Sequence, residues 1–337
     1  MLEQHRIELS DRSQIGEARR VATRAAQLAG LAEDDCGRVS IVASELATNA
    51  IRHATGGEML VRGFVDPGGN AVELIAIDRG PGMRDPARCM SDGYSTAGSL
   101  GHGLGAIDRL SDLMDFYSVP SRGTVIYSRI EAAAHKGRQS QSEESCWSAI
   151  SVAAPGETEC GDNWDVAQSE NWVSAVVADG LGHGPLAAKA ANEAVRTFAL
   201  APFRAPEAYL ARAHQSLHGT RGAALACARV DLNSRTLVFA GIGNISASIV
   251  AHHSQIGKSL ASHNGTIGLE IAKIQEFQYS ALEGDLLLMH SDGLTSRWKL
   301  ADYPGLSRRS PALIAAVLYR DFKRGRDDAT IVVVRLK

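Results

Sequence analysis

Residues 172–184 read WVSAVVADGLGHG, an apolar run that ends at Asp179 and Gly180. A short continuous apolar run bounded by a turn signal is typical of a buried strand. The alanine-rich stretch that follows, from Pro185 to about Phe198, is typical of a helix that begins with proline. The segment therefore predicts a buried strand that carries an acidic side chain to the edge of a sheet, just before a helix.

Three more acidic positions adjoin apolar runs in the second half of the chain. They are Asp162 before the strand at 172–178, Asp292 after LLLMH at 286–290, and Asp327-Asp328 before IVVV at 331–334. Carboxylates gathered at one sheet edge repel each other unless a cation neutralises them. Oxygen donors without a histidine or cysteine set favour Mg²⁺ or Mn²⁺ over zinc, and two such ions can bind phosphate and activate a bridging water. A single Asp-Gly pair is also typical of a plain turn, so the metal-site prediction depends on all four positions together.

The first half carries three short motifs. Glu45 and Asn49 stand side by side, four residues apart, on a helix that we expect to begin at Asp34-Asp35. The sequence DRGPG at 78–82 ends a predicted strand, and GHGLG at 101–105 opens a further predicted helix.

The chemistry of these motifs points in one direction. A carboxylate such as Asp78 can accept a hydrogen bond from an exocyclic amine, and the glycines let the backbone approach a flat ring. The free N–H groups of the helix opened by 101–105, which we expect to reach about Met114, favour an anion. Each motif alone is weak, because a turn, a capping glycine cluster or a solvated pair would look the same. Their order and placement together predict binding of a phosphate and a purine.

The chain is long enough for two domains. It has 337 residues, and about 100–200 residues make one domain. The most polar stretch, 135–145, lies between two strand-like runs and predicts a linker. We therefore expect α/β domains at 1–134 and 146–337, and their different patterns indicate a fusion of unlike units.

Composition excludes several classes of protein. Hydrophobic residues make up 45% and charged residues 22% of the sequence, and the net charge is −3 without a basic stripe for nucleic acid. Apolar runs are shorter than the ~18–20 residues of a membrane span, and residues 1–6 lack the apolar core of a signal peptide. Five scattered cysteines without a C-x-x-C pair indicate reduced thiols. We expect a cytoplasmic protein with neither a membrane nor a nucleic-acid partner.

The motifs of the first half, with ELATNAIRHA at 45–54, resemble the ATP boxes of the GHKL superfamily, most closely those of RsbT-like and anti-sigma-factor serine kinases. The resemblance covers residues 1 to about 133 and implies a Bergerat α/β sandwich. It also implies that Asn49 holds Mg²⁺ with ATP, that Glu45 activates the acceptor hydroxyl and that Asp78 reads adenine. The further ATP-binding positions that it implies are Gly80, Gly82, Gly101, Gly103 and Gly105. Histidine kinases share these boxes, but no helical hairpin with a phosphoacceptor histidine precedes Glu45, which favours the serine kinases.

The second half resembles the SpoIIE-type branch of the metal-dependent (2C-like) Ser/Thr protein phosphatases, most closely the short RsbX-like enzymes. The resemblance spans about 146–337, at Gly161-Asp162, Asp179–Gly182, Arg221–Ala223, Gly243-Asn244, Ser291–Leu294 and Asp327-Asp328. It implies an α-β-β-α sandwich and a binuclear Mn²⁺ or Mg²⁺ site. In that site Asp179 bridges both ions and the Gly180 carbonyl joins one of them. Asp292 and Asp327 complete the other, and Asp162 holds metal-bound waters.

One position departs from the larger 2C enzymes. They carry a histidine two residues after the bridging aspartate, where this chain has Leu181. Protonation of the leaving group then falls to His183 or to water.

Together the two resemblances imply a bifunctional regulator of partner switching. Its first domain would phosphorylate, and its second would dephosphorylate, a serine or threonine of a STAS-domain antagonist or anti-antagonist in a stress or sigma-factor pathway. Both activities on one phosphosite would only consume ATP, so they are either gated or serve different sites. Two alternatives stay open: the first domain is a nucleotide-dependent sensor that regulates the phosphatase, or it sequesters a sigma factor. A downstream phosphatase is a further candidate partner.

Overall fold

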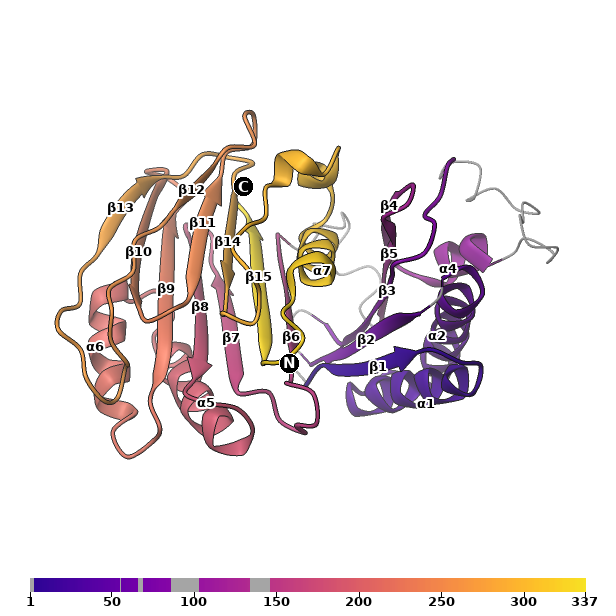
Figure 1. Cartoon of the computed structure of the whole chain (residues 1–337), viewed down its shortest axis with the longest axis horizontal. Coiled ribbons are helices and arrows are strands. Elements are labelled where there is room, and N and C mark those ends of the chain that lie inside the picture. Colours follow the sequence, from indigo (N-terminus) through magenta and orange to yellow (C-terminus); the bar gives the residue numbers. More distant parts are fainter. Residues whose placement is uncertain (1–2, 55, 66–68, 86–102, 134–145) are drawn as a thin grey trace. The chain divides into compact units, whose positions relative to one another are not determined.

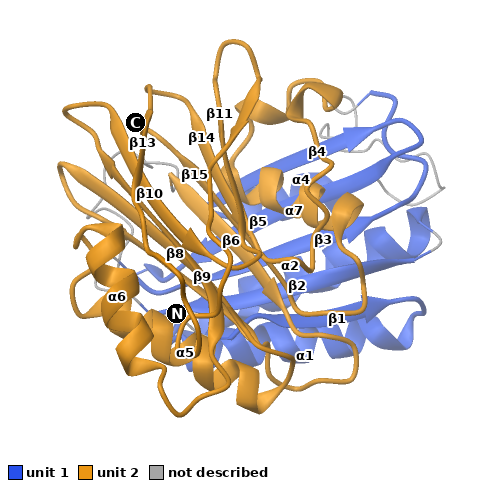
Figure 2. Ribbon diagram, turned by 60° about the vertical axis from the view of Figure 1, so that its left-hand side comes forward, with its two compact units in different colours: residues 1–144 blue, residues 145–337 orange. Residues whose placement is uncertain are grey.

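The computed structural model describes residues 3–54, 56–65, 69–85, 103–133 and 146–337. Internal contacts divide the chain into two compact units, residues 1–144 and 145–337 (Figure 2). The predicted linker at 135–145 lies outside the described residues. No helix in the described ranges is both long enough and apolar enough to span a membrane.

The first unit is a single antiparallel sheet with helices packed on one face (Figure 1). The strand order is β1-β2-β3-β5-β4, with β1 His5–Leu9, β2 Gly57–Phe64, β3 Ala71–Asp78, β4 Leu113–Val119 and β5 Gly123–Glu131. The helices are α1 Ser13–Leu28, α2 Glu33–His53 and α4 Gly103–Leu110. Helices α1 and α2 share a core with the sheet that includes Ala22, Val42, Leu46, Leu74 and Ile126.

Helix α2 carries the first two predicted site residues. Its first turn is acidic and its last turn is basic, which complements the helix dipole at both ends. Val39, Val42, Ala43, Leu46 and Ala50 form an apolar stripe along α2, and all five are buried. This stripe fixes the rotation of α2, and therefore the side on which Glu45 and Asn49 stand.

One predicted boundary is wrong. Helix α4 ends at Leu110, not near Met114, and β4 already begins at Leu113. Asp112 turns the chain: its N–H donates to the Arg129 carbonyl at 2.9 Å, and its carboxylate accepts from the Glu131 N–H at 2.8 Å. Pairing with β5 therefore overrides the helical pattern of residues 111–114.

The second unit is a four-layer α-β-β-α sandwich (Figure 1). One antiparallel sheet has the order β13-β10-β9-β8-β7 and the other β12-β11-β14-β15-β6. The first comprises β7 Asp162–Gln168, β8 Trp172–Gly180, β9 Ala223–Asp231, β10 Thr236–Ile242 and β13 Phe277–Ser280. The second comprises β6 Trp147–Val152, β11 Ser246–Val250, β12 Gly257–Ser259, β14 Leu286–His290 and β15 Ala329–Arg335.

Three helices cover the outer faces of this sandwich. Helices α5 Pro185–Ala199 and α6 Pro206–Ser216 pack on the first sheet through a core that includes Val176, Ala191, Phe198, Leu210 and Leu225. Helix α7 Pro311–Phe322 contacts β6 and β15. A separate core between the two sheets includes Trp164, Val177, Phe239, Met289 and Val332.

The sandwich brings the ends of several strands together at one edge. Asp162 opens β7 directly opposite Asp179 near the end of β8. Ser291, just after β14, donates its N–H to the Thr330 carbonyl of β15 at 3.0 Å. Because both sheets end here, the four predicted acidic positions come from both layers of the sandwich.

Gly293 tests how tightly this edge is built. A Cβ at this position would overlap the Asp328 carbonyl oxygen, so Gly293→Ala is expected to destabilise the second unit by about 2–3 kcal/mol. All four tryptophans lie after residue 145, so urea unfolding followed by tryptophan fluorescence reports this unit alone.

Gly257→Ala is the matched control. The nearest atom to its Cβ would be Val250 Cγ2 at 3.7 Å, and a change within about 0.5 kcal/mol is expected. Equal effects of the two substitutions would contradict the close approach at Gly293.

Candidate functional site

The first unit brings Glu45, Asn49 and Gly103 together. A Cβ at Gly103 would lie 3.2 Å from Asn49 Oδ1 and 3.5 Å from Glu45 Oε2. The first turn of α4 therefore rests directly against the two polar side chains of α2. Any larger residue at 103 would fill the space in front of them, so glycine keeps the helix N-terminus and the acid-amide pair around one shared space.

Asp78 is held at the end of β3 by two backbone donors. Its Oδ1 accepts from the Gly80 N–H at 2.7 Å and from the Thr124 N–H at 3.1 Å. These bonds fix the direction of the carboxylate before any ligand arrives.

The glycines after Asp78 permit close packing of the turn. A Cβ at Gly80 would lie 2.7 Å from the His53 carbonyl oxygen, and Gly82 has a φ of +67° against the Val119 carbonyl. His53 lies about one helical turn beyond Asn49 on α2. The turn after Asp78 thus packs against the end of α2, about one helical turn beyond Asn49. Gly105 is buried in α4, and Gly101 lies outside the described residues.

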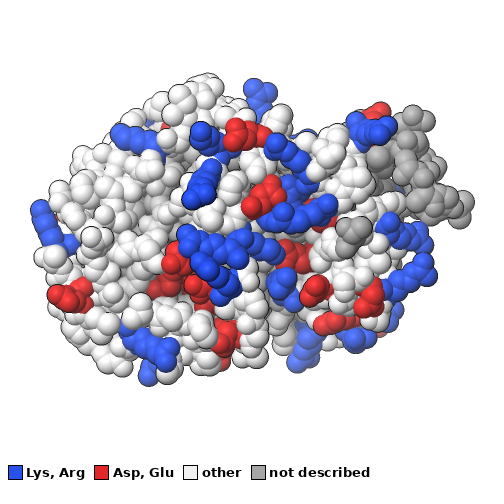
Figure 3. Space-filling model, viewed as in Figure 1, with Lys and Arg blue, Asp and Glu red and all other residues white. Residues whose placement is uncertain are grey.

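In the second unit, carboxylates gather at the edge where the strands end. Burial raises the pKa of Asp162 well above its ordinary value, and the neighbouring Asp179 adds to the shift. Burial, together with the nearby Asp292, Asp327 and Asp328, raises the pKa of Asp179 to about 7. Figure 3 shows acidic side chains gathered on the visible face of this unit, with basic ones beside them. The strand ends thus hold Asp162, Asp179 and the neighbouring carboxylates close together and partly out of contact with water.

Neighbouring polar groups fix the positions of these carboxylates. Asn244 Nδ2 donates to Asp292 Oδ2 at 2.8 Å, and the Asp328 N–H donates to Asp327 Oδ1 at 3.0 Å. The Ala154 N–H donates to Asp328 Oδ1 at 2.8 Å. Asp328 was not among the predicted metal ligands. Its place next to Asp327 in the sequence could have indicated that it belongs to the acidic edge. Its bond to the Ala154 N–H, from the segment after β6, could not be predicted from the sequence.

The donor set fits a hydrated hard cation. Asp162 Oδ2 is buried and has no hydrogen-bond partner, which is costly for a carboxylate unless a positive charge compensates. Within the described ranges, no three His, Cys, Asp or Glu side chains are placed to hold one ion directly. Mg²⁺ usually keeps several waters and takes only one or two carboxylates. The arrangement therefore suits Mg²⁺- or Mn²⁺-type coordination and does not suit a four-ligand zinc site.

Comparison with known proteins follows this division of the chain. A family model described as stage II sporulation protein E (SpoIIE) matches residues 169–337, half of the chain. The chain belongs to the SpoIIE family. A second model, described as a histidine kinase-like ATPase domain, matches residues 9–129.

Individual relatives agree with both assignments. Serine/threonine-protein kinase RsbT of Bacillus subtilis (strain 168) is 37% identical over 109 residues, which are 32% of this chain and 82% of RsbT. Phosphoserine phosphatase RsbX of the same organism is 25% identical over 144 residues, which are 41% of this chain and 69% of RsbX. A solved chain from work on the bacterial stressosome matches with a TM-score of 0.52 and 29% identity, over 56% of this chain and 98% of its own.

The predicted family and fold class are thereby confirmed. This SpoIIE-family chain joins an RsbT-like ATPase domain to a 2C-type Ser/Thr phosphatase domain. Divalent metal and ATP are the cofactors of these two domain types.

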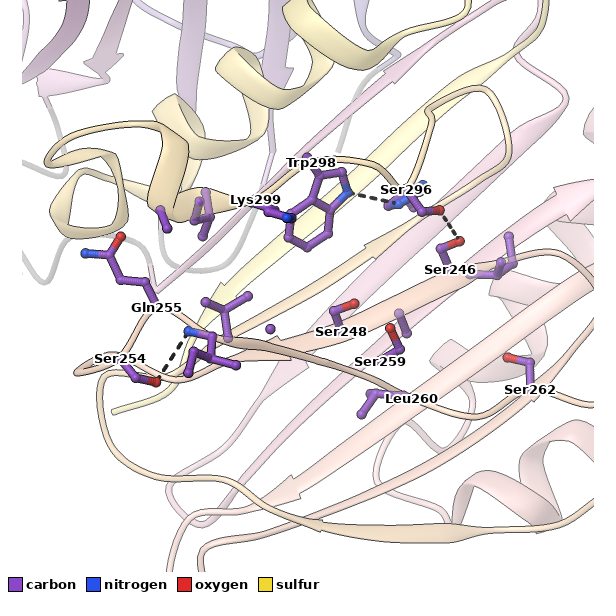
Figure 4. A pocket seen from close by; sticks show the side chains of 18 residues that line it. Ser246, Ser248, Ser254, Gln255, Ser259, Leu260, Ser262, Ser296, Trp298 and Lys299 are labelled. Atoms are coloured by element: carbon purple, nitrogen blue, oxygen red, sulfur yellow. Dashed lines mark hydrogen bonds between the residues drawn. The ribbon is translucent and has the colours of Figure 1, made fainter.

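The SpoIIE-family unit also contains a serine-rich pocket of about 570 Å³ beside β11 and β14 (Figure 4). Trp298 Nε1 donates to the buried His290 Nε2 at 3.3 Å, and His290 Nδ1 donates to the Ser291 carbonyl at 2.8 Å. Ser246 and Ser296 share a hydrogen bond of 2.8 Å at the same end. The pocket wall thus fixes the end of β14 immediately before Asp292.

The burial of Asp179, together with the repulsion among the carboxylates, predicts a pH-dependent stability in the metal-free protein. Between the ordinary pKa of 3.8 and about 7, folded Asp179 keeps a proton that the unfolded chain has lost, so stability falls as pH rises through this window. Asp179→Asn removes this group, so at pH 8 the free energy of unfolding of the variant should exceed that of the wild type by about 2–4 kcal/mol. Thermal unfolding in the presence of a chelator at pH 5 and pH 8, followed by tryptophan fluorescence, measures the difference in stability between the variant and the wild type.

Two controls accompany this measurement. Asp231→Asn changes a half-buried carboxylate whose pKa is lowered by backbone N–H groups, so it should not increase the stability at pH 8. Saturating Mn²⁺ should make the wild type the more stable of the two, because it binds the cation with one more carboxylate than Asp179→Asn does. A wild type that becomes more stable from pH 5 to pH 8 without metal would contradict the repulsion.

Proposed function

We propose that this chain sets the phosphorylation state of a serine or threonine on a STAS-domain protein in a partner-switching pathway. The N-terminal unit would transfer the phosphoryl group from ATP, and the C-terminal unit would remove it. The observation that supports both halves is that predicted site residues lie close together within each unit. Gly103 rests against Asn49 and Glu45, and Asp162, Asp179 and Asp292 gather at one edge.

In the kinase half, α2 supplies the reacting groups. We assign Asn49 to the Mg²⁺ that accompanies ATP and Glu45 to the acceptor hydroxyl, from which its carboxylate takes the proton. Asp78, fixed by the Gly80 and Thr124 N–H groups, accepts a hydrogen bond from the adenine amine. Gly80 and Gly82 allow the approach of the base, and Gly101, Gly103 and Gly105 cover the phosphates.

In the phosphatase half, the carboxylates form the metal site. We assign Asp179 and the Gly180 carbonyl to one divalent ion, and Asp179, Asp292 and Asp327 to a second, which these carboxylates would hold in part through bound waters. Asp162 orients waters at this site. When bound, Mn²⁺ or Mg²⁺ holds the phosphate and lowers the pKa of a water. The hydrogen bond from Asn244 then keeps Asp292 directed at the site.

The relatives of the two units support the choice of partner. RsbT is a kinase and RsbX a phosphoserine phosphatase of one organism, and the stressosome chain matches at 29% identity. We therefore propose that the substrate is a STAS-domain antagonist or anti-antagonist and its phosphorylated form. A sigma factor or a downstream phosphatase would be bound further along the same pathway.

The two activities should be separable by mutation. Asp179→Asn is expected to lower Mn²⁺-dependent dephosphorylation at least about 100-fold and to leave phosphotransfer from ATP intact, because the units have separate sites. Asn49→Ala is expected to do the reverse. The measurement is mass spectrometry of a STAS protein encoded beside this chain, incubated with full-length enzyme and ATP, with and without Mn²⁺.

The outcomes distinguish this proposal from its alternatives. Loss of both activities in each variant would contradict separate sites. Absence of phosphotransfer, with a phosphatase rate that changes on addition of ATP, would make the first unit a nucleotide sensor. Capture of a sigma factor without phosphotransfer would make that unit an anti-sigma factor.

A further inference from the structure

Two exposed leucines lie on segments that meet beside the acidic edge, the edge of the second unit where Asp179 and the neighbouring carboxylates gather. Within residues 146–337, the leucine and isoleucine side chains that are more than half exposed are Leu181, Leu186, Leu200, Ile256, Leu269 and Leu282. Single exposed apolar residues are ordinary on a protein surface, whereas adjoining ones are typical of an interaction surface. Leu181 and Leu269 are far apart in the sequence, and the fold brings their segments together.

Strand pairing places these two segments in one row. Gly180, which precedes Leu181, pairs with Ala223 at the start of β9. Ala223 in turn exchanges two backbone hydrogen bonds with Ile267, at 2.9 and 3.0 Å. Leu181 therefore follows the first member of the row, and Leu269 stands two residues after the last.

Gly222 lies between the two leucines. The Leu181 N–H donates to the Gly222 carbonyl at 3.0 Å. A Cβ at Gly222 would lie 3.1 Å from Leu269 Cγ, so the Leu269 side chain rests against the same residue. The two leucines thus border one stretch of surface, which begins two residues after Asp179.

The loop that carries Leu269 is held by two histidines of α6. The Gly268 N–H donates to His214 Nδ1 at 3.0 Å, and His218 Nδ1 donates to the Gly268 carbonyl at 3.1 Å. Gly268 has a φ of +91°, and a Cβ there would lie 2.7 Å from Leu217 Cβ. Leu269 is therefore exposed on a fixed backbone, so a partner that buries its side chain does not first have to order the loop.

A positive charge without a partner lies beside these leucines. Arg221 is exposed, and among the described residues its guanidinium takes part in neither an ion pair nor a hydrogen bond. A Cβ at Gly182 would lie 3.1 Å from Arg221 Nη1, so the guanidinium lies over the residue next to Leu181. An unpaired cation that adjoins apolar side chains suits a segment with both a negative group and an apolar side chain.

We propose that Leu181, Leu269 and Arg221 form a docking surface for the phosphorylated segment of the partner protein. The segment would place an apolar side chain on the leucines, and its negative charge would face Arg221. This inference rests on the phosphatase half of the proposed function and adds a substrate preference to it.

The row of paired segments sets the spacing of this preference. Gly180, Ala223 and Ile267 stand on three neighbouring chains, and neighbouring chains in a sheet lie about 4.8 Å apart, so Leu269 is expected about 10 Å from the acidic edge. An extended peptide advances about 3.3 Å per residue. The apolar side chain is therefore expected about three residues from the phosphorylated serine or threonine.

Synthetic phosphopeptides test this spacing. Each has one phosphoserine in a host of alanine and glycine, with a single leucine one, three or six residues away on either side or with no leucine. Full-length enzyme with Mn²⁺ is expected to hydrolyse a peptide with leucine at the third residue with a kcat/KM about 10-fold above that of the peptide without leucine, because docking buries one leucine side chain. Leu269→Ser is expected to remove this preference.

Two controls separate docking from catalysis and folding. Leu269→Ser should leave kcat for 4-nitrophenyl phosphate unchanged, because this substrate has no side chain that reaches residue 269. Leu282→Ser changes a leucine that is 54% exposed, against 53% for Leu269, and that lies between β13 and β14. It should keep the preference of the wild type.

Binding without turnover gives an independent measurement. In Asp179→Asn, which is expected to hydrolyse the peptide at least about 100-fold more slowly, fluorescence anisotropy of the labelled peptide with leucine at the third residue reports its Kd. Adding Leu269→Ser should raise this Kd about 10-fold, and adding Leu282→Ser should leave it unchanged.

The outcomes distinguish the docking surface from the phosphatase assignment. Equal kcat/KM for all peptides, a preference for another spacing, or a preference that Leu269→Ser keeps would overturn the docking surface alone. Dimerisation that Leu269→Ser abolishes, with unchanged peptide kinetics, would assign the surface to a second copy of the chain instead. A wild type with no Mn²⁺-dependent hydrolysis of any peptide or of 4-nitrophenyl phosphate would overturn the phosphatase assignment, and the docking surface with it.

Discussion

The carboxylates at one edge of the second unit place the main constraint on its architecture. Like charges held close together and partly buried oppose folding, and the raised pKa values of Asp162 and Asp179 show this cost. A core between the two sheets and a second core beneath α5 and α6 provide the stabilisation that holds the edge together. The edge is therefore costly to fold without a cation, and the divalent ions of the proposed function would offset that cost.

In both units, two segments approach each other so closely at the candidate site that only glycine fits between them. At Gly180 a Cβ would overlap the first turn of α5, and at Gly103 it would approach Asn49. In each case a helix N-terminus lies near polar side chains. The two unrelated folds thus share one solution, in which glycine brings a helix N-terminus close to a proposed phosphate site.

The sequence predicted the local parts of both sites and missed their long-range parts. Apolar runs that end in Asp179 and Asp292 predicted acidic strand ends, since period and burial are local signals. The pairing of Asp162 with Asp179 is a matter of register between strands, which the sequence does not reveal. Helix α4 ended early because Asp112 bonds to Glu131, and the His183–Glu157 contact joins loops 26 residues apart. Neither contact leaves a periodic pattern in the sequence.

Metal use limits how opposed activities in one chain could be regulated. On the proposed function, the kinase site needs a divalent ion with its nucleotide, and the acidic edge needs divalent ions of its own. Loss of the metal would therefore stop both directions, so metal supply cannot choose between them. ATP is required by the kinase direction alone, and the phosphorylated partner by the phosphatase direction alone. On the proposed function, the ratio of ATP to phosphorylated partner would therefore determine whether this chain phosphorylates or dephosphorylates its partner on balance.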